Sequence, residues 1–188
     1  MIKTSIDKTR VRGFEEISVE QKLKDFKEVL EIKLPQRATK GSAGYDIYAP
    51  FDICLEPGEN IVIPTGIRAY MQTNEVLKIY PRSGLGFKYK ARLANTTGII
   101  DSDYYYSDNE GHIMIKICNE GLRNIEIKSG TAFCQGIFSN YLLADGDDFE
   151  TGNTRNGGFG STSWYKRGRY SFPLVAFNLL KREILHNE

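Results

Sequence analysis

Hydrophobic and polar positions alternate with a period of two over residues 33–140, which predicts that this part of the chain forms strands. The clearest run is residues 112–118, which places three isoleucines on one face of a strand. Shorter runs lie on either side of it, separated by turn residues such as Pro57-Gly58. Short strands at this spacing are typical of a sandwich or barrel and not of βαβ units. We therefore expect an all-β fold.

The residues before this region follow a different pattern. Residues 1–17 are polar and mixed, without a period. Apolar residues then recur at spacings of four, three and four, at Val19, Leu23, Phe26 and Leu30. This spacing predicts an amphipathic helix of about three turns that ends before Pro35, with Ser18 as its N-cap and Gln21 as the capping-box partner. The helix either packs on the main domain or binds a partner.

The C-terminal part changes character twice. Residues 144–163 are first acidic and then rich in glycine and polar residues, so we expect a mobile arm that buries no core. Residues 164–188 are basic, and Pro173 suits the start of a helix whose apolar stripe is too short to span a bilayer. This tail docks on the core, touches a membrane surface, binds a partner or has no role. The chain then divides into an N-terminal extension (1–32), a β core (33–143), the arm and the tail.

Composition excludes several classes of function. Lys and Arg number 25 and Asp and Glu 24, so the chain lacks the basic excess of a generic nucleic-acid binder. Three cysteines without a CxxC pair argue against a disulfide framework, and only two histidines argue against a zinc site built on His and Cys. No apolar stretch of 18 residues and no signal peptide occur, so we expect a cytoplasmic protein without a transmembrane segment.

Two glycine-rich segments suit phosphate binding. Residues 81–86, PRSGLG, place an Arg and a Ser beside glycines that allow a ligand to approach the backbone, and no helix pattern follows them. Residues 155–162 combine Arg, Ser, Thr and glycine N–H groups with one Phe. A decorated loop and a linker are the structural alternatives for these two segments.

Two further segments carry carboxylates. Asp46 follows a glycine in residues 43–49 and is either a turn residue or a functional one. Asp101 and Asp103 point to the same face if they lie on one strand, so one of them suits a general base or a metal partner. Tyr104 then offers a ring to a sugar or a base, and an exposed acidic loop is the alternative.

Taken together and in chain order, these segments resemble the motifs of the trimeric all-β dUTP pyrophosphatase (dUTPase) family. The five similar segments are residues 43–49, 81–86, 98–104 with Gly111, 130–135 and 155–162. The resemblance covers residues 33–163, and PRSGLG with GIIDSDY and GGFGST is a highly specific combination. It implies a jelly-roll-like β-barrel or sandwich with a flexible C-terminal arm. It also implies hydrolysis of dUTP to dUMP and pyrophosphate, with Mg²⁺ on the triphosphate.

The resemblance assigns roles to residues around the sugar and base. Asp101 would be the general base that activates a water for in-line attack on the α-phosphorus, and it would touch the 3′-hydroxyl. Tyr104 would lie against the deoxyribose and leave no room for a 2′-hydroxyl. Uracil recognition would fall to Asn95, Gly98, Ile99 and Met114.

It also assigns the triphosphate contacts. The α- and β-phosphates would be held by Arg82, Ser83, Gly84 and Gln135. Asp46 would reach the phosphate-bound Mg²⁺ through water. The arm would close over the nucleotide, with Phe159 stacked on uracil and the γ-phosphate held by Arg155, Gly160, Ser161 and Thr162. Three subunits would share each site, which implies a homotrimer.

This chain departs from the family pattern in three places. Six residues, 105–110, separate Tyr104 from Gly111 where a tight turn is usual, and they form a solvated loop or a specificity or partner loop. Arg155 stands four residues before Phe159 where five is frequent, and the chain continues past Ser163 as the basic tail. Two other functions stay open: a dCTP deaminase-type enzyme of the same fold, and a dUTP-responsive regulatory protein that contacts a partner through the tail or N-terminal helix.

Overall fold

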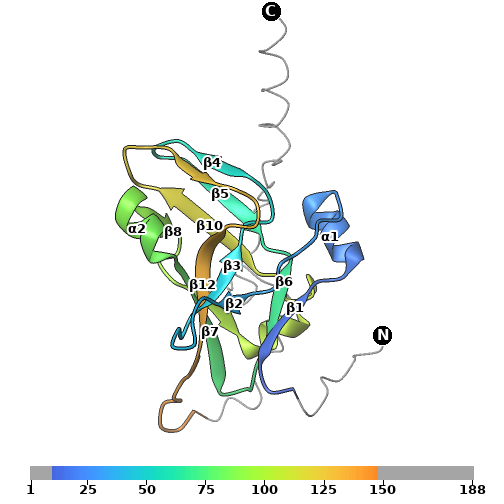
Figure 1. The fold of residues 1–188 in the computed structure, drawn as a ribbon. Helices are drawn as coiled ribbons and strands as arrows, with labels where there is room; N and C mark the ends of the chain where they lie inside the picture. Colours follow the sequence, from blue (N-terminus) through green and yellow to red (C-terminus); the bar gives the residue numbers. More distant parts are fainter. Residues whose placement is uncertain (1–9, 148–188) are drawn as a thin grey trace, which may run out of the picture.

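The computed structural model describes residues 10–147 (Figure 1). The tail and most of the arm lie outside the described residues, and so do the roles expected for Arg155, Phe159, Gly160, Ser161 and Thr162. None of the described helices is long and apolar enough to cross a membrane.

Within the described residues, antiparallel strands form four sheets, which confirms the expected all-β fold. The largest sheet has the order β2 (Gln36–Arg37), β3 (Tyr45–Tyr48), β12 (Ala132–Asn140), β7 (Glu75–Pro81), β9 (Gly98–Asp101). A second sheet has the order β5 (Asn60–Pro64), β10 (Met114–Asn119), β8 (Ala91–Leu93). Two further pairs are β1 (Gly13–Glu16) with β6 (Ile67–Tyr70), and β11 (Ile125–Ile127) with β4 (Ile53–Leu55).

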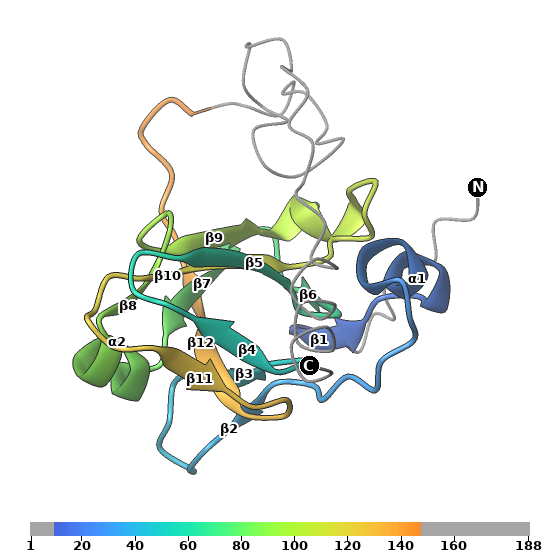
Figure 2. The same ribbon diagram turned by 90° about the horizontal axis from the view of Figure 1, so that it is seen from above.

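The sheets surround one shared hydrophobic core, as the two ribbon views show (Figures 1 and 2). The predicted isoleucine face of β10 and the residue before it is confirmed, because Ile113, Ile115 and Ile117 are all buried. Each of the four sheets contributes buried residues, among them Ile47, Ile63, Ile67, Ile125 and Phe133. One core built from every sheet is what a sandwich or barrel requires.

One short strand, β1, was not expected from the sequence. Strand β1 falls in the polar N-terminal region and pairs with β6 in the register Gly13↔Tyr70 to Glu16↔Ile67. Its alternation is hidden because only Phe14 marks the core-facing side of β1. Glu16, which shares that side, is charged and pairs with Lys22 of α1.

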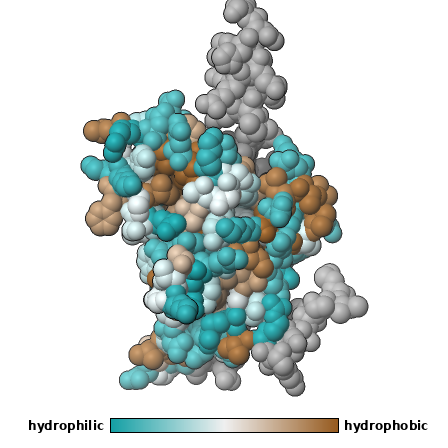
Figure 3. Space-filling model, in the orientation of Figure 1, coloured by the Kyte–Doolittle hydropathy of each residue, from teal (hydrophilic) through white to brown (hydrophobic). Residues whose placement is uncertain are grey.

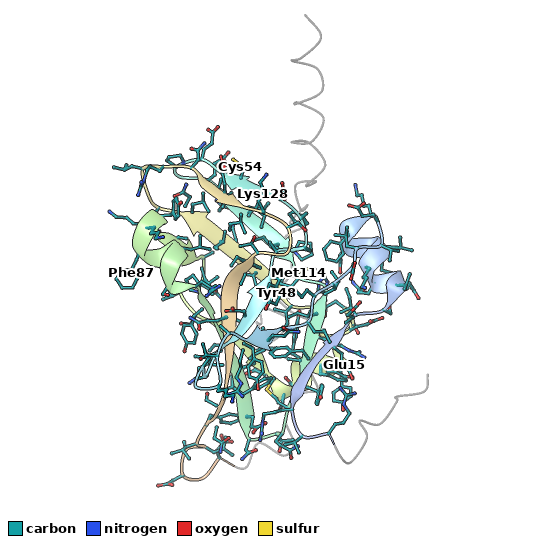
Figure 4. All side chains as sticks on the ribbon, viewed as in Figure 1. Glu15, Tyr48, Cys54, Phe87, Met114 and Lys128 are labelled. Carbon is teal, nitrogen blue, oxygen red and sulfur yellow. The ribbon has the colours of Figure 1, made fainter. Side chains whose placement is uncertain are left out.

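A helix follows Pro81, and the expectation of a loop over residues 81–86 was wrong. Helix α2 (Ser83–Tyr89) begins directly after Arg82 and ends at Lys90, which has a left-handed backbone and donates its N–H to Gly86 O. No residue of α2 is fully buried, and Phe87 projects outward into solvent (Figure 4). A short helix with two glycines and no buried stripe carries no periodic signal, which is why the sequence did not reveal it.

The N-terminal helix α1 (Val19–Phe26) is present, with Ser18 as its N-cap: the Ser18 side chain accepts a hydrogen bond from Gln21 N at 3.1 Å. It stops one turn earlier than predicted, because Lys27 adopts a left-handed backbone that ends the helix.

Only part of the predicted apolar stripe of α1 packs on the protein: Phe26 lies against the core, whereas the first two residues of the stripe do not. Val19 and Leu23 are 57% and 48% exposed, and hydrophobic surface shows over α1 in the space-filling view (Figure 3). Gln21 and Lys22 are buried instead. These polar side chains have partners: Gln21 Nε2 donates to Asp25 Oδ2, and Lys22 pairs with Glu16. Satisfied polar groups therefore hold the helix in place.

Candidate active site

Three predicted phosphate-binding or metal-binding residues meet at one end of the largest sheet. Gln135 on β12 lies opposite Asp46 on β3 and opposite Tyr80 on β7. Arg82 follows the end of β7, and its Nε lies 3.5 Å from Asp46 Oδ1. The Arg82 backbone N–H donates to Phe133 O at 3.0 Å, which fixes the start of α2 to the middle strand.

Two glycine positions keep this end of the sheet open. A Cβ on residue 44 would lie 2.5 Å from Gln135 Oε1, so Gly44 makes room for the Gln135 side chain. A Cβ on residue 84 would meet nothing within 4 Å. Ser83 and Gly84 are the first two residues of α2, so their N–H groups have no acceptor within the helix.

We call Asp46, Arg82, Ser83, Gly84 and Gln135 the sheet-end cluster. The cluster combines one carboxylate, a guanidinium that is half-exposed, an amide and helix N–H groups. Guanidinium and amide N–H donors bind phosphate oxygens well, and a single nearby carboxylate adds an acceptor for a metal-bound water.

The predicted general base, Asp101, ends the edge strand β9. It lies opposite Val76 on β7, and Gly98 at the other end of β9 lies opposite Ile79. Asp103 does not share a strand with Asp101, because the 3₁₀ helix η1 (Ser102–Tyr106) begins directly after Asp101. The expectation that the two carboxylates point to one strand face was therefore wrong, and only Asp101 sits at the strand end.

Tyr104 is held firmly in η1. Its hydroxyl donates to His112 O at 2.8 Å and accepts from Asn109 Nδ2 at 2.9 Å. Its own carbonyl accepts from Ser107 Oγ at 2.7 Å. Only 6% of Tyr104 is exposed, so the ring forms a rigid wall and not a movable stacking surface.

The residues predicted to read the base lie on neighbouring backbone segments. Asn95 is in the exposed turn between β8 and β9, and Ala94 N donates to Lys116 O, which holds this turn beside β10. Ile99 is exposed on β9, and Met114 begins β10 (Figure 4). We call Asn95, Gly98, Ile99, Asp101, Tyr104 and Met114 the hairpin cluster.

Within one chain, Asp101 is far from the sheet-end cluster. Val76, its partner on β7, is five residues from Pro81, and at the usual rise of a strand this is about 17 Å. A nucleotide α-phosphate held by Arg82 is then out of reach of the Asp101 carboxylate of the same chain. The structure brings Asp46, Arg82 and Gln135 together and leaves the Asp101 end of β9 far from them along the sheet.

Sequence reasoning missed the role of His112. Its ring is fully buried, with Nδ1 2.6 Å from Asp25 Oδ2 and with Nε2 accepting from Gly66 N at 2.8 Å. Burial lowers the pKa of His112, and the bond to Asp25 offsets this only in part. The signal available was one histidine beside a predicted strand, which does not distinguish a hydrogen-bonded core residue from a surface one.

Comparisons with known proteins identify the family of this chain. The family described as dUTPase matches residues 30–163. A deoxyuridine 5′-triphosphate nucleotidohydrolase of Lactococcus lactis is 43% identical over 154 residues, which are 81% of this chain and 98% of the relative. One from Tolumonas auensis is 38% identical and covers 77% of this chain and 96% of its own length.

Solved structures show the same fold. A dUTPase from Streptococcus mutans superposes with a TM-score of 0.58 and 36% identity, covering 71% of this chain and 99% of that one. A dUTPase of Staphylococcus aureus phage phi11 gives a TM-score of 0.55 at 21% identity, covering 76% of this chain and 99% of the phage protein, which supports the fold alone. The family match spans most of the chain and includes the residues of both clusters, so this chain belongs to the dUTPase family.

Proposed function

We propose that this protein hydrolyses dUTP to dUMP and pyrophosphate by attack of a water at the α-phosphorus. The observation that carries the proposal is the gathering of Asp46, Arg82 and Gln135 at one sheet end, from strands far apart in sequence. The residues to which the family resemblance assigns the triphosphate and its metal are thus adjacent in space, in a chain that belongs to that family.

In the proposed reaction, Asp101 takes a proton from the attacking water. A new P–O bond forms at the α-phosphorus, the bond from that phosphorus to the α,β-bridging oxygen breaks, and pyrophosphate leaves with the bridging oxygen. Arg82 and the N–H groups of Ser83 and Gly84 hold the α- and β-phosphates, with Gln135 as a further donor. These donors stabilise the negative charge that develops on the leaving pyrophosphate.

Sugar and base selection falls to the hairpin cluster. The buried, hydrogen-bonded Tyr104 ring offers no room for a 2′-hydroxyl, because its position is set by His112 O and Asn109. Backbone groups around Ile99 and Met114, with Asn95, read the uracil edge. A base with the wrong donor or acceptor leaves a buried polar group unpaired, which costs about 1–3 kcal/mol.

The donor set fits Mg²⁺ bound mainly by the substrate. Within residues 10–147, no three His, Cys, Asp or Glu side chains gather as a metal site. Asp46, the one carboxylate of the sheet-end cluster, would hold the ion through water, as suits a metal that keeps several waters. When bound, Mg²⁺ neutralises triphosphate charge and orients the chain for attack. The arm residues Arg155, Phe159, Gly160, Ser161 and Thr162 would close over base and γ-phosphate.

We further propose that each site is shared between chains of a homotrimer. Support comes from the separation of about 17 Å along the sheet between Asp101 and the strand end that carries Arg82. A site that needs both residues is incomplete in one chain and complete where the hairpin cluster of one subunit meets the sheet-end cluster of another.

Mixing two inactive variants tests this sharing. Asp101→Asn and Arg82→Ala chains, unfolded together at equal amounts and refolded, should regain about a quarter of wild-type activity. Random assembly makes three quarters of the trimers mixed, and each of these has one site of three with both intact residues. Each variant refolded alone should stay inactive. If mixed trimers are seen by native mass spectrometry and no activity returns, each site lies within one chain.

A further inference from the structure

The N-terminal segment Gly13–Phe26 lies beside the segment 102–112 (Figure 2), and side-chain hydrogen bonds join the two segments at three points. Tyr105 donates its hydroxyl to Glu15 Oε2 at 2.6 Å. The Glu110 carboxylate accepts from Ser18 N at 2.8 Å and from Ser18 Oγ at 2.7 Å. His112 Nδ1 lies 2.6 Å from Asp25 Oδ2. The expectation of a solvated loop at 105–110 describes only part of this segment: Tyr106 and Asp108 are exposed, whereas Tyr105 contacts β1 and Glu110 contacts the start of α1.

The N-terminal cap of α1 includes a residue that is distant in the sequence, Glu110. A capping box uses the side chain three residues after the cap to accept from the cap N–H. Here Glu110, 92 residues away, accepts from Ser18 N, and the Gln21 side chain donates to Asp25 instead. The Asp25 carboxylate therefore has two hydrogen-bond partners, the Gln21 amide and the His112 imidazole. The capping-box role expected for the Gln21 side chain is replaced by a long-range contact.

His112 connects Asp25 of α1 to Tyr104 of η1. Because His112 Nε2 accepts from Gly66 N, Nδ1 carries the proton and donates to Asp25. The His112 imidazole is buried against Phe26 of helix α1, and the two ring centroids are 5.8 Å apart. The His112 carbonyl accepts from the Tyr104 hydroxyl at 2.8 Å. Asp25 is thus linked to Tyr104 through one residue: the His112 side chain bonds to Asp25, and the His112 carbonyl bonds to the Tyr104 hydroxyl.

We propose that the N-terminal segment sets the position of the Tyr104 ring and thereby the discrimination between deoxyribose and ribose, with Asp25 and His112 as positioning residues. The inference rests on the proposed function, in which Tyr104 faces the sugar. The proposal gives α1 and the segment 105–110 one shared role, because each supplies hydrogen-bond partners to the other.

Hydrogen exchange tests the mechanical part without any substrate. In the full chain, Asp25→Ala removes the acceptor of His112 Nδ1–H, and amides in residues 102–112 should exchange about tenfold faster. Glu20→Ala is the matched control, because Glu20 is on the same helix, pairs only with Lys24 among the described ion pairs, and is highly exposed. It should leave exchange in 102–112 unchanged. Unchanged exchange in Asp25→Ala would overturn the proposal whatever the activity.

Kinetics tests the specificity part. In Asp25→Ala, the ratio of kcat/KM for dUTP to that for UTP should fall roughly tenfold, mainly through a higher kcat/KM for UTP, with kcat for dUTP within about twofold of wild type. Asp25→Asn keeps an oxygen acceptor and should restore most of the ratio. An unchanged ratio beside faster exchange would show a purely structural contact and would contradict the proposal.

A milder variant covers the case in which Asp25→Ala does not fold. Tyr105→Phe removes only the hydroxyl bond to Glu15 and should shift exchange and the dUTP/UTP ratio in the same direction by a smaller factor. No change in either quantity would count against the proposal. Failure of the wild-type chain to hydrolyse dUTP would instead reject the proposed function, and the exchange result would still decide whether the N-terminal segment holds residues 102–112.

Discussion

Replacing Asp101 with asparagine is expected to lower kcat for dUTP by about 10²–10⁴-fold, the range that one positioned general base supplies. Asparagine keeps the size of the side chain and cannot accept the water proton. The residue ends β9 opposite Val76, so the backbone around it is held by the sheet and should not move. Steady-state pyrophosphate release measures the loss.

The same variant should still bind nucleotide. Its affinity for a non-hydrolysable dUTP analogue should stay within a few-fold of wild type, because the donors of the sheet-end cluster are intact. Asp103→Asn is the matched control: it is an Asp two residues away, exposed, and in η1 and not in β9. It should keep near-wild-type kcat. Retained turnover in Asp101→Asn, or an equal loss in Asp103→Asn, would remove Asp101 from the role of base.

Replacing Phe133 with alanine is expected to destabilise the protein by about 3–5 kcal/mol, as for other fully buried aromatic residues. Phe133 has no exposed surface and lies at the register shift between Ala132 and Cys134, where β12 bends along β3. Its carbonyl accepts from Arg82 N, so a cavity here loosens the sheet-end cluster as well as the core. Urea unfolding at fixed protein concentration measures the change.

Phe133→Leu provides the graded comparison. Leucine keeps the site apolar and fills most of the volume, so the cost should stay below about 1.5 kcal/mol. Equal midpoints for Phe133→Ala and wild type, with the same slope against urea, would show that this part of the core does not limit stability.

The sequence predicted most of the strands that carry the site. β10 alternates clearly because one face of it meets the core, and that alternation needs no knowledge of the partner strand. β7 and β12 bury consecutive residues and were predicted as apolar runs. The residues of the sheet-end cluster could be named because their motifs are specific. Their adjacency could not be derived from pattern alone, since it depends on β12 pairing with both β3 and β7.

Helix α1 shows where pattern fails. The apolar stripe of Val19 and Leu23 predicted the buried face, and the structure buries Gln21 and Lys22 instead. Periodicity measures only apolar burial, whereas here Glu16 and Asp25 supply the partners that allow polar side chains to be buried. Partners of that kind come from the fold and leave no periodic trace.

The segment 105–110 shows the same limit at long range. Its tyrosines and acidic residues have the composition of an exposed loop. Tyr105 and Glu110 bond instead to residues 90 and 92 positions earlier, and burial with the bond to Glu15 raises the pKa of Tyr105 to about 12. Contacts across such separations follow from how β1 pairs with β6 and cannot be inferred from local sequence.

The most direct test of the central claim is pyrophosphate release by the full-length chain from dUTP, dCTP, dTTP and UTP, each with Mg²⁺. The proposed function predicts rapid turnover of dUTP and little of the other three, since the hairpin cluster selects uracil and the buried Tyr104 excludes a 2′-hydroxyl. Release of ammonia from dCTP would place the chain with deaminase-type enzymes of the same fold, and release of pyrophosphate from dCTP without ammonia would contradict the selection of uracil. Absence of dUTP turnover would contradict the proposed hydrolysis of dUTP. A dUTP-responsive regulatory protein would then be the remaining hypothesis.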